Sequence, residues 1–379
     1  MAQTQLNTAS RVQKWNSEFF FEYVRDSAFM PYMGESGGPG AMMPILTKYE
    51  LTSGGKTINM PFIEKLDGAG VRGTNTLEGN EEAIGNYNQQ VTVNWNRHAV
   101  SIPKPEEHWT EMDLLRAGKM GLRTWAAEGL RDDIISGLWA YDAGSILRGV
   151  DADDTSTAAR NPAARYAAYS EGTKDAWLAA NTDRFLFGNA VSNHSANDHS
   201  AALLNVDTTS DRLTAAHVSL AKMVAREADR RIRPTKQSVS EGRDYFVYFV
   251  GSRGFRDLKA DTAMTAANRD ARQRNVDSNP LFQDGDLIWD GVVIREIPEI
   301  PVLVGVGNGT SDVQPGFLCG AQALGVAWGQ KPKAVFSKAD DYGFVKKPGI
   351  EECRGVAKMV FNGVQHGMVN TFYSAPATA

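Results

Sequence analysis

Apolar residues follow a helical spacing in two long segments of the chain. The first segment lies between Thr110 and Ala140, where apolar residues recur at steps of seven and four. Its members are Leu115, Leu122, Ala126, Leu130, Ile134 and Leu138. The pattern predicts a helix of about 28 residues, roughly 40 Å long, with Thr110 and Asp113 at its capped start. A similar stripe predicts a second helix over residues 211–232, which Pro234 ends.

Alternation typical of a strand is clearest in residues 87–102. Val91, Val93 and Trp95 fall on one face, whereas Val100 and Ile102 fall on the other. The apolar phase therefore changes near Arg97 and His98, which predicts a bulge or a change of neighbouring strand. Together with the glycine-punctuated residues before it, this segment predicts a long β-hairpin over residues 46–102. Such a hairpin is marginally stable alone.

The rest of the chain mixes short strands with weaker patterns. YFVYFV (245–250) is typical of a buried strand, and residues 286–306 contain two more strand candidates. Four short β or mixed segments follow between residue 316 and the end of the chain. The aromatic residues of 15–29 predict a short helix, whereas residues 141–205 show little pattern. These elements indicate the α+β class.

Composition excludes several classes of protein. The formal net charge of −5 argues against a protein that grips nucleic acid over its whole surface. Two cysteines, Cys319 and Cys353, argue against a disulfide scaffold. The first residues lack the apolar segment of a signal peptide, and no apolar run approaches membrane-spanning length. We therefore expect a soluble protein of a reducing cytoplasm, with no membrane partner.

Gly68, Gly70 and Gly73 form a literal G-x-G-x-x-G. In a dinucleotide site this spacing follows a buried strand and opens a helix, whose N-terminus holds the pyrophosphate. Here the preceding IEKL is polar, and the following TNTLEGNEEAIGN contains two further glycines. No βαβ unit follows. The pattern favours a flexible turn, and a nucleotide-binding enzyme that uses this loop stays as the alternative function.

Other candidate sites are weaker. His194 and His199 are five residues apart, which does not place both on one helix face, so a solvated loop is favoured over a metal site. Asp151, Asp153 and Asp154 resemble the start of a calcium loop, but the required Gly and Glu are missing from its sixth and twelfth positions. No nucleophile elbow or Cys–His pair is present. We expect no catalytic residue, no metal site and no cofactor.

Two segments are locally basic. Residues 226–236 carry five basic residues against Glu227 and Asp229, and residues 252–275 carry six against three acidic ones. Either segment has the charge to touch phosphates. The interspersed acids fit ion pairing between subunits at least as well.

The order of several segments then becomes informative. L-x-G-x-E-E stands before an alternating strand, and NPLF is followed by W-x-G-V-x-I. The segments are GAGVRGTNTLEGNEEA (68–83), YNQQVTVNWNRHAV (87–100), the long helix, YFVYFVGSRGFRDLKAD (245–261), NPLFQDGDLIWDGVVIREIPEIP (279–301), GFLCGAQALGVAWG (316–329), DDYGF (340–344) and GVAKMVFNGVQHGMVNT (355–371). In this order the chain resembles the major capsid (coat) proteins of tailed bacteriophages with the Hong Kong 97 coat fold, and is most similar to the phage N-four type.

The resemblance implies a fold with an N-terminal arm, an extended β-hairpin loop, a long spine helix, and peripheral and axial domains. Its parts correspond to residues 1–45 (arm), 46–108 (extended loop), 109–235 (peripheral domain, with a candidate insertion at 141–205), 236–330 (axial domain) and 331–379 (C-terminal strands returning to the core).

The resemblance also implies a function. The protein would be a structural shell protein and not an enzyme, assembling in the bacterial cytoplasm into the virion. Copies of the chain would form hexamers and pentamers of an icosahedral head around double-stranded DNA, touching that DNA weakly and without sequence preference. Scaffolding, portal and cement or decoration proteins are further candidate partners.

The hairpin would lack a core because its partner is a neighbouring subunit. Gly68, Gly70 and Gly73 are then the expected hinges of the loop. The expected inter-subunit contacts are Arg72, Glu78, Glu81, Glu82 and Arg97, for which ordinary solvated polarity is the equal alternative.

Overall fold

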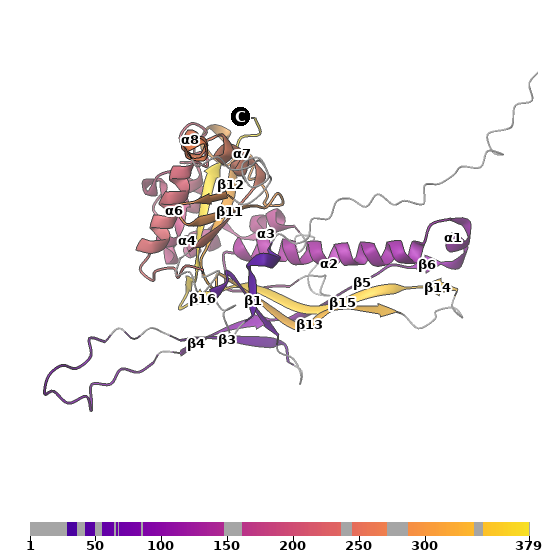
Figure 1. Ribbon diagram of the computed structural model, residues 1–379, viewed down its shortest axis with the longest axis horizontal. Coiled ribbons are helices and arrows are strands. Elements are labelled where there is room, and N and C mark those ends of the chain that lie inside the picture. Colours follow the sequence, from indigo (N-terminus) through magenta and orange to yellow (C-terminus); the bar gives the residue numbers. More distant parts are fainter. Residues whose placement is uncertain are drawn as a thin grey trace, which may run out of the picture.

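Two regions of different shape make up the protein (Figure 1). A compact domain carries most of the helices, and an elongated region consists of one long helix beside a sheet, from which a hairpin extends. The structure is a computed structural model that describes residues 29–35, 42–49, 55–63, 66, 68–84, 86–147, 161–235, 245–270, 287–336 and 344–378. The helix predicted at 15–29, apart from its last residue, and the aspartates of 151–154 lie outside this range.

The elongated region is built on a mixed sheet in the order β1-β2-β13-β15-β5, with β7 beside β15. Its strands are β1 (Met33–Glu35), β2 (Ile45–Tyr49), β5 (Asn94–Ala99), β7 (Ser145–Ile146), β13 (Leu324–Phe336) and β15 (Pro348–Lys358). The long helix α2 (Leu114–Leu138) runs along this sheet. A Cβ on Gly137 would lie 2.8 Å from a methyl of Leu324 and 3.0 Å from one of Val356, so helix and sheet pack closely there.

Helix α2 begins later than the apolar stripe alone suggests. The Asp113 carboxylate accepts a hydrogen bond from the backbone N–H of Arg116 at 2.9 Å, so Asp113 caps the helix and Thr110 does not. Residues Lys104–Trp109 form a separate helix, α1, with Pro105 in its first turn, where a proline is tolerated. The predicted stripe is otherwise confirmed: its members from Leu122 onward are buried or half-buried.

The hairpin consists of β3 (Thr57–Ile63) and β4 (Asn86–Thr92), paired from Thr57 with Thr92 to Ile63 with Asn86. It is shorter than the predicted 46–102 because β2 and β5 pair with β13 and β15 of the sheet. The strand changes partner at Val93, and not near Arg97 and His98 as predicted. The base of the hairpin also has a core of its own subunit: Ile58, Met60, Phe62, Val91 and Val93 pack with Ala327, Cys353, Ala357, Met359 and Phe361.

The compact domain surrounds a second sheet in the order β10-β11-β9-β12-β18-β8. Its strands are β8 (Phe185–Phe187), β9 (Phe246–Val250), β10 (Leu287–Trp289), β11 (Val292–Glu296), β12 (Val313–Cys319) and β18 (Met368–Ser374). Alternate residues of β9 enter two different apolar clusters, with Val247 and Phe249 on one side and Phe246, Tyr248 and Val250 on the other. Both faces are covered, which explains the continuous apolar run that predicts this strand.

Helices cover the two faces of this sheet. They are α3 (Pro162–Ala168), α4 (Glu171–Ala180), α5 (His199–Leu203), α6 (Ala215–Glu227), α7 (Ser252–Ala260) and α8 (Thr262–Asp270). Side chains of α6, α7 and α8 enter one cluster, whereas α2, α3, α4 and α5 contribute to the other. Helix α6 starts at its cap Thr214 and ends at Glu227, well before Pro234.

The weakly patterned residues 141–205 belong to the fold's core where they are described. Tyr141, Phe185, Phe187 and Leu203 lie in the larger apolar cluster, and β8 pairs with β18. That cluster also contains residues of α2, β13 and β15, so it continues from one region into the other. Four short strands form two further pairs: β6 (Ile102–Pro103) with β14 (Val345–Lys346), and β16 (Val360–Phe361) with β17 (Val364–Gln365).

Candidate assembly surfaces

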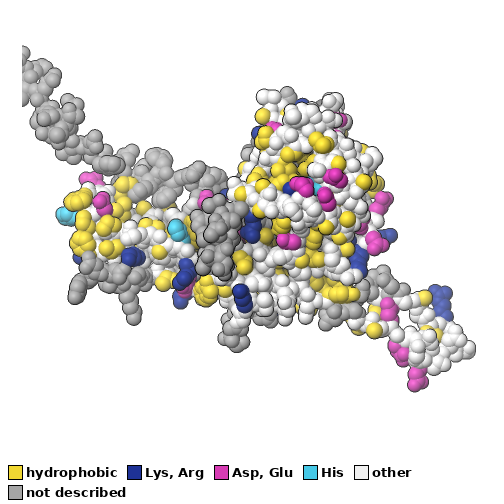
Figure 2. All heavy atoms as spheres, turned by 180° about the vertical axis from the view of Figure 1, so that it is seen from behind, with side chains coloured by type: hydrophobic (Ala, Val, Ile, Leu, Met, Phe, Trp, Pro, Cys, Tyr) yellow, Lys and Arg dark blue, Asp and Glu magenta, His cyan; other side chains and the backbone are white. Residues whose placement is uncertain are grey.

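The loop that joins β3 to β4 projects away from the rest of the molecule (Figure 1). Within residues 68–84 every residue except Val71 is exposed, and Leu77 exposes 62% of its surface. In Figure 2 the loop surface is mostly backbone and side chains that are neither charged nor hydrophobic, with a few charged and hydrophobic side chains among them. A segment that buries so little in its own subunit gains little stability from it.

Glycine suits the three positions of this loop for two different structural reasons. Gly70 and Gly73 adopt φ angles of +68° and +70°, a backbone conformation that favours glycine. Gly68 instead allows a close approach, since a Cβ there would lie 2.5 Å from the Glu82 carboxylate. Residues 74–84 form turns and irregular backbone, with no helix after Gly73. The loop therefore lacks the helix N-terminus that a dinucleotide site needs.

Two of the predicted contact residues hold the loop in shape. Glu82 Oε2 accepts a hydrogen bond from the Gly68 N–H at 2.7 Å and closes the neck of the loop. Glu81 Oε2 accepts one from the Gly79 N–H, also at 2.7 Å. The side chains of Arg72 and Glu78 are exposed and make no hydrogen bond or ion pair with described residues.

Arg97 lies apart from the other four predicted contact residues. It stands on β5, exposed and opposite Glu351 of β15 in the strand register. The structure thus places four of the five residues on the loop and one on the sheet, and does not bring them together as a cluster.

A second exposed surface, which the sequence analysis missed, lies at the far end of the elongated region (Figure 2). Trp109 at the end of α1 exposes 76% of its surface, and Phe344 beside β14 is also exposed. Lys346 and Glu107 form an ion pair at 2.7 Å between β14 and α1. The signal in the sequence was a tryptophan that fits no apolar stripe.

The first half of α2 adds a basic face near this end. Arg116, Lys119 and Arg123 are exposed and make no side-chain hydrogen bond or ion pair within the described parts of the chain. Spacings of three and four residues place them on one side of a helix. The sequence contained this signal, because no acidic residue occurs from Leu114 to Ala127.

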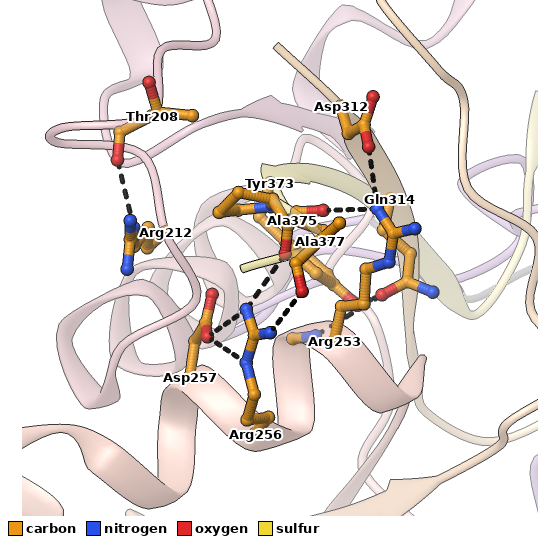
Figure 3. Close-up of polar contacts among 12 residues, drawn as sticks. Thr208, Arg212, Arg253, Arg256, Asp257, Asp312, Gln314, Tyr373, Ala375 and Ala377 are labelled. Carbon is orange, nitrogen blue, oxygen red and sulfur yellow. Dashed lines mark hydrogen bonds and ion pairs between the residues drawn. The ribbon is translucent and has the colours of Figure 1, made fainter. Parts of the chain in front are cut away.

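The basic segment 252–275, as far as it is described, pairs within its own domain (Figure 3). Arg253 contacts the Asp312 carboxylate at 2.7 Å and donates to the carbonyl of Ala375. Arg256 pairs with Asp257 at 2.8 Å and donates to the carbonyls of Pro376 and Ala377. These arginines hold the segment that follows β18.

In the other basic segment, 226–236, fewer arginine side chains contact groups of the same chain, as far as the structure describes it. Arg230 lies over the ring of Phe361 at 4.6 Å, a cation–π contact. Arg226, Arg231 and Arg233 are exposed and have no ion pair among the described residues. Contact of either segment with phosphates or with another subunit stays a prediction.

Buried polar groups tie α2 to the sheet of the elongated region. Arg354 of β15 pairs with Asp133 of α2 at 2.6 Å and lies 3.5 Å from Glu352, which accepts a hydrogen bond from Asn96. Lys358 donates to the carbonyl of Ala140, just beyond the end of α2, at 2.6 Å. Burial lowers the pKa of Lys358 to about 7. These contacts fix the helix on the sheet.

The histidines differ from the predicted solvated loop. His199 is buried, and its Nε2 lies 2.7 Å from the Tyr141 hydroxyl. Burial lowers the pKa of His199 to about 3, so its ring is neutral, and burial also lowers the pKa of His194. The part of the chain that the structure covers contains no group of three or more metal-ligating side chains. Nor does any described helix have the length and apolarity needed to cross a membrane.

Comparison with known proteins identifies the family. The sequence model of the phage capsid protein family matches residues 3–373. The chain belongs to the phage capsid protein family. It is 25% identical to the major capsid protein of Pseudomonas phage KPP25, with 95% of this chain and 94% of that protein covered.

Two solved capsid structures share the fold. The capsid subunit of cyanophage Pam1 is 38% identical, with all of both chains covered and a TM-score of 0.81. The capsid of Ralstonia phage GP4 has a TM-score of 0.70 at 20% identity, again over all of both chains, and supports the fold alone.

These findings decide two predictions from the sequence. The α+β class and the Hong Kong 97 type of capsid fold are confirmed. The prediction of a phage major capsid protein is confirmed as well, and the alternative of a nucleotide-binding enzyme has no support.

Proposed function

We propose that this capsid protein builds its shell from hexamers and pentamers, in an icosahedral head that encloses double-stranded DNA and forms in the cytoplasm of a bacterial host. The observation that carries the proposal is the exposure of the extended loop. Its own subunit covers almost none of residues 68–84. A second copy that covers the loop would supply the burial that its own chain does not.

The positions of the exposed surfaces support a head-to-tail arrangement. The loop lies at one end of the molecule and helix α1 at the other (Figure 1), and the exposed Trp109 is the last residue of α1. Contacts between two different surfaces of the same chain are heterologous, and they close into rings when the rotation allows it. Many weak contacts of this kind add up in a shell.

We propose that scaffolding, portal and cement or decoration proteins act in trans, and that packaged DNA touches the shell weakly. Weak contact agrees with the net charge of −5 and with the internal pairing of Arg253 and Arg256. A lining with many free cations would bind phosphates tightly.

Replacing the loop tests the proposal. Residues 64–85 are exchanged for Asn-Gly, a two-residue turn that suits a tight hairpin between Ile63 and Asn86. This variant keeps β4, whose Val91 is buried at the base of the hairpin. We expect a folded subunit by circular dichroism that forms no shells by negative-stain microscopy, alone or with any scaffolding partner.

The control is Asn75→Ser, an exposed loop substitution that should assemble as the wild type does. Normal shells from the shortened chain would contradict the assignment of the loop. A wild-type chain that stays a monomer under all assembly conditions would contradict the assembly itself.

A further inference from the structure

We propose that the short hairpin β16–β17, residues 360–365, sets the direction in which the extended loop leaves the subunit, with Phe361 as the positioning residue. The inference goes beyond the proposed function, because it concerns the single subunit and does not depend on how copies assemble. Phe361 is 6% exposed and belongs to the apolar cluster that packs under the β3–β4 hairpin. Its ring touches that hairpin close to the point where the loop begins.

The β3–β4 hairpin needs support from other parts of the chain. Two strands alone are marginally stable in water. At its base, Ile58 and Val91 belong to the same apolar cluster as Ala327 and Ala357 of the sheet. Farther out, the side chain of Gln89 donates one hydrogen bond to a backbone carbonyl, at 3.2 Å. The sheet therefore fixes where the hairpin begins, whereas the outer end depends on other contacts.

Phe361 supplies a contact at this outer end. Phe62 and Tyr87 stand opposite each other in the strand register, one step before the last pair, Ile63 with Asn86. The ring of Phe361 lies 5.9 Å from that of Phe62 and 4.6 Å from that of Tyr87, between centroids, and both pairs are edge-to-face. Aromatic pairs prefer such defined arrangements. The contact thus constrains the angle of the hairpin as well as burying it.

The β16–β17 hairpin is itself fixed to the compact domain. Gln365 is fully buried, and its backbone N–H donates to the side-chain oxygen of Asn181 at 2.7 Å. Its side-chain amide donates to the carbonyls of Arg184 and Met368, each at 3.3 Å. Asn181 caps the end of α4, and Met368 begins β18. In Figure 1, β16 lies between the compact domain and the β3–β4 hairpin. Phe361 therefore links the position of that domain to the direction of the hairpin.

Two further side chains hold the rings in place. The guanidinium of Arg230 lies over the Phe361 ring, 4.6 Å from its centre. The ring of His366 lies 5.2 Å from that of Phe62 and 6.3 Å from that of Phe361. Burial, together with the charges of nearby arginines, lowers the pKa of His366 to about 4. At pH 7 its ring is neutral and packs among the aromatic rings without a charge.

A residue that only fills the cluster would not have this effect. Leu46 of β2 provides the comparison, because it belongs to the same cluster and is also 6% exposed. Its strand pairs with β1 and β13 and not with the hairpin. Truncating Leu46 should weaken the cluster without releasing the outer end of the hairpin.

Distances between spin labels test the inference in the isolated subunit. One label is attached at Asn88→Cys on β4 and the other at Met223→Cys on α6, and both positions are exposed. Cys319 and Cys353 are buried, so background labelling should be low. Double electron–electron resonance then measures the distribution of distances between the hairpin and the compact domain.

Three variants are compared in this doubly labelled background. Phe361→Leu keeps an apolar side chain but removes the ring, and we expect the distance distribution to widen about twofold or more, because the outer end of a two-stranded hairpin then lacks support. Phe361→Tyr keeps the ring and should give the width of the wild type. Leu46→Ala should lower the midpoint of unfolding and leave the width unchanged.

The outcomes are separable. An unchanged width for Phe361→Leu would overturn the inference. Equal widening by Leu46→Ala would also overturn it, because loss of the cluster and not of the ring would then explain the effect. The yield of particles is read separately, and we expect it to fall for Phe361→Leu. A normal yield from a subunit with a widened distribution would count against the proposed use of the loop between copies and leave this inference standing.

Discussion

The strand β9 and the extended loop show two ways in which one chain uses its residues. Every residue of β9 is buried, and its side chains alternate between two apolar clusters. In residues 68–84 all but Val71 are exposed, and hydrogen bonds from Glu81 and Glu82 to the loop's own backbone shape the segment. The compact domain has an apolar core of its own, whereas residues 68–84 bury little within their own subunit, and we propose that another chain covers them.

The largest expected effect is in the compact domain. Phe249 is fully buried, with its ring 4.9 Å from that of Phe29 and 5.4 Å from that of Tyr32. We expect Phe249→Ala to lower the free energy of unfolding of the free subunit by about 3–5 kcal/mol, because it leaves a cavity. Leu77→Ala in the loop should change it by less than about 0.5 kcal/mol. Urea denaturation measures both, and equal effects would break the comparison.

A buried and an exposed ion pair sharpen the same contrast. Arg354→Met leaves the carboxylates of Asp133 and Glu352 buried without their cation, so we expect a loss of about 3–5 kcal/mol. Lys346→Met removes the partly exposed pair with Glu107 and should cost less than about 1 kcal/mol. Urea denaturation of the two variants provides the test. A similar loss of unfolding free energy from both variants would show that burial does not determine how much these ion pairs contribute to stability.

Acid should destabilise the compact domain through its buried histidines. Burial lowers the pKa of His217 to about 4. Between pH 6.5 and pH 4 the unfolded chain therefore binds a proton at this residue, whereas the folded chain does not. The contribution of His217 to the free energy of unfolding is fully present above pH 6.5. It falls by about 3 kcal/mol as the pH drops to 4. His217→Gln should flatten the dependence of unfolding free energy on pH in this range, whatever it costs at pH 7.

The matched control uses the loop, which has no histidine in residues 66–84. Shortening the loop should leave the pH dependence unchanged. A slope that is the same in wild type and His217→Gln would show that this histidine takes up its proton in the folded protein.

The smallest expected effect lies in the loop itself. Gly70→Ala places a side chain at a φ of +68° with no atom within 4 Å, so the cost is conformational only, about 1 kcal/mol, and confined to the loop. The unfolding transition of the free subunit should not move, whereas the yield of shells should fall. Ala69→Ser is the control. A lower midpoint of unfolding for Gly70→Ala would show that the loop folds together with the core.

Local patterns predicted those elements whose environment the sequence itself reveals. The apolar run of β9 and the stripe of α2 lie where they were expected, because a strand buried on both faces and a helix buried along one face have distinct periods. The start of α2 was misplaced, since Thr110 and Asp113 are both good capping residues. The hydrogen bond from the Arg116 N–H to the Asp113 carboxylate shows that Asp113 is the cap.

The errors concern residues whose partners are distant in sequence. Strand β5 belongs to the sheet because β15, some 250 residues later, pairs with it. His199 is buried because Tyr141 and the rings around it enclose a short helix that has no long stripe. Neither contact leaves a periodic signal in one sequence.

The sequence by itself determined the class of fold, the family and the polar, glycine-rich character of the loop, because these follow from periodicity, segment order and composition. The tertiary structure decided where the hairpin ends, that its base packs on its own sheet, and which carboxylates of the loop are free. It also placed the loop and the basic face of α2 at opposite ends of the molecule. Such relations depend on long-range pairing, which no local pattern encodes.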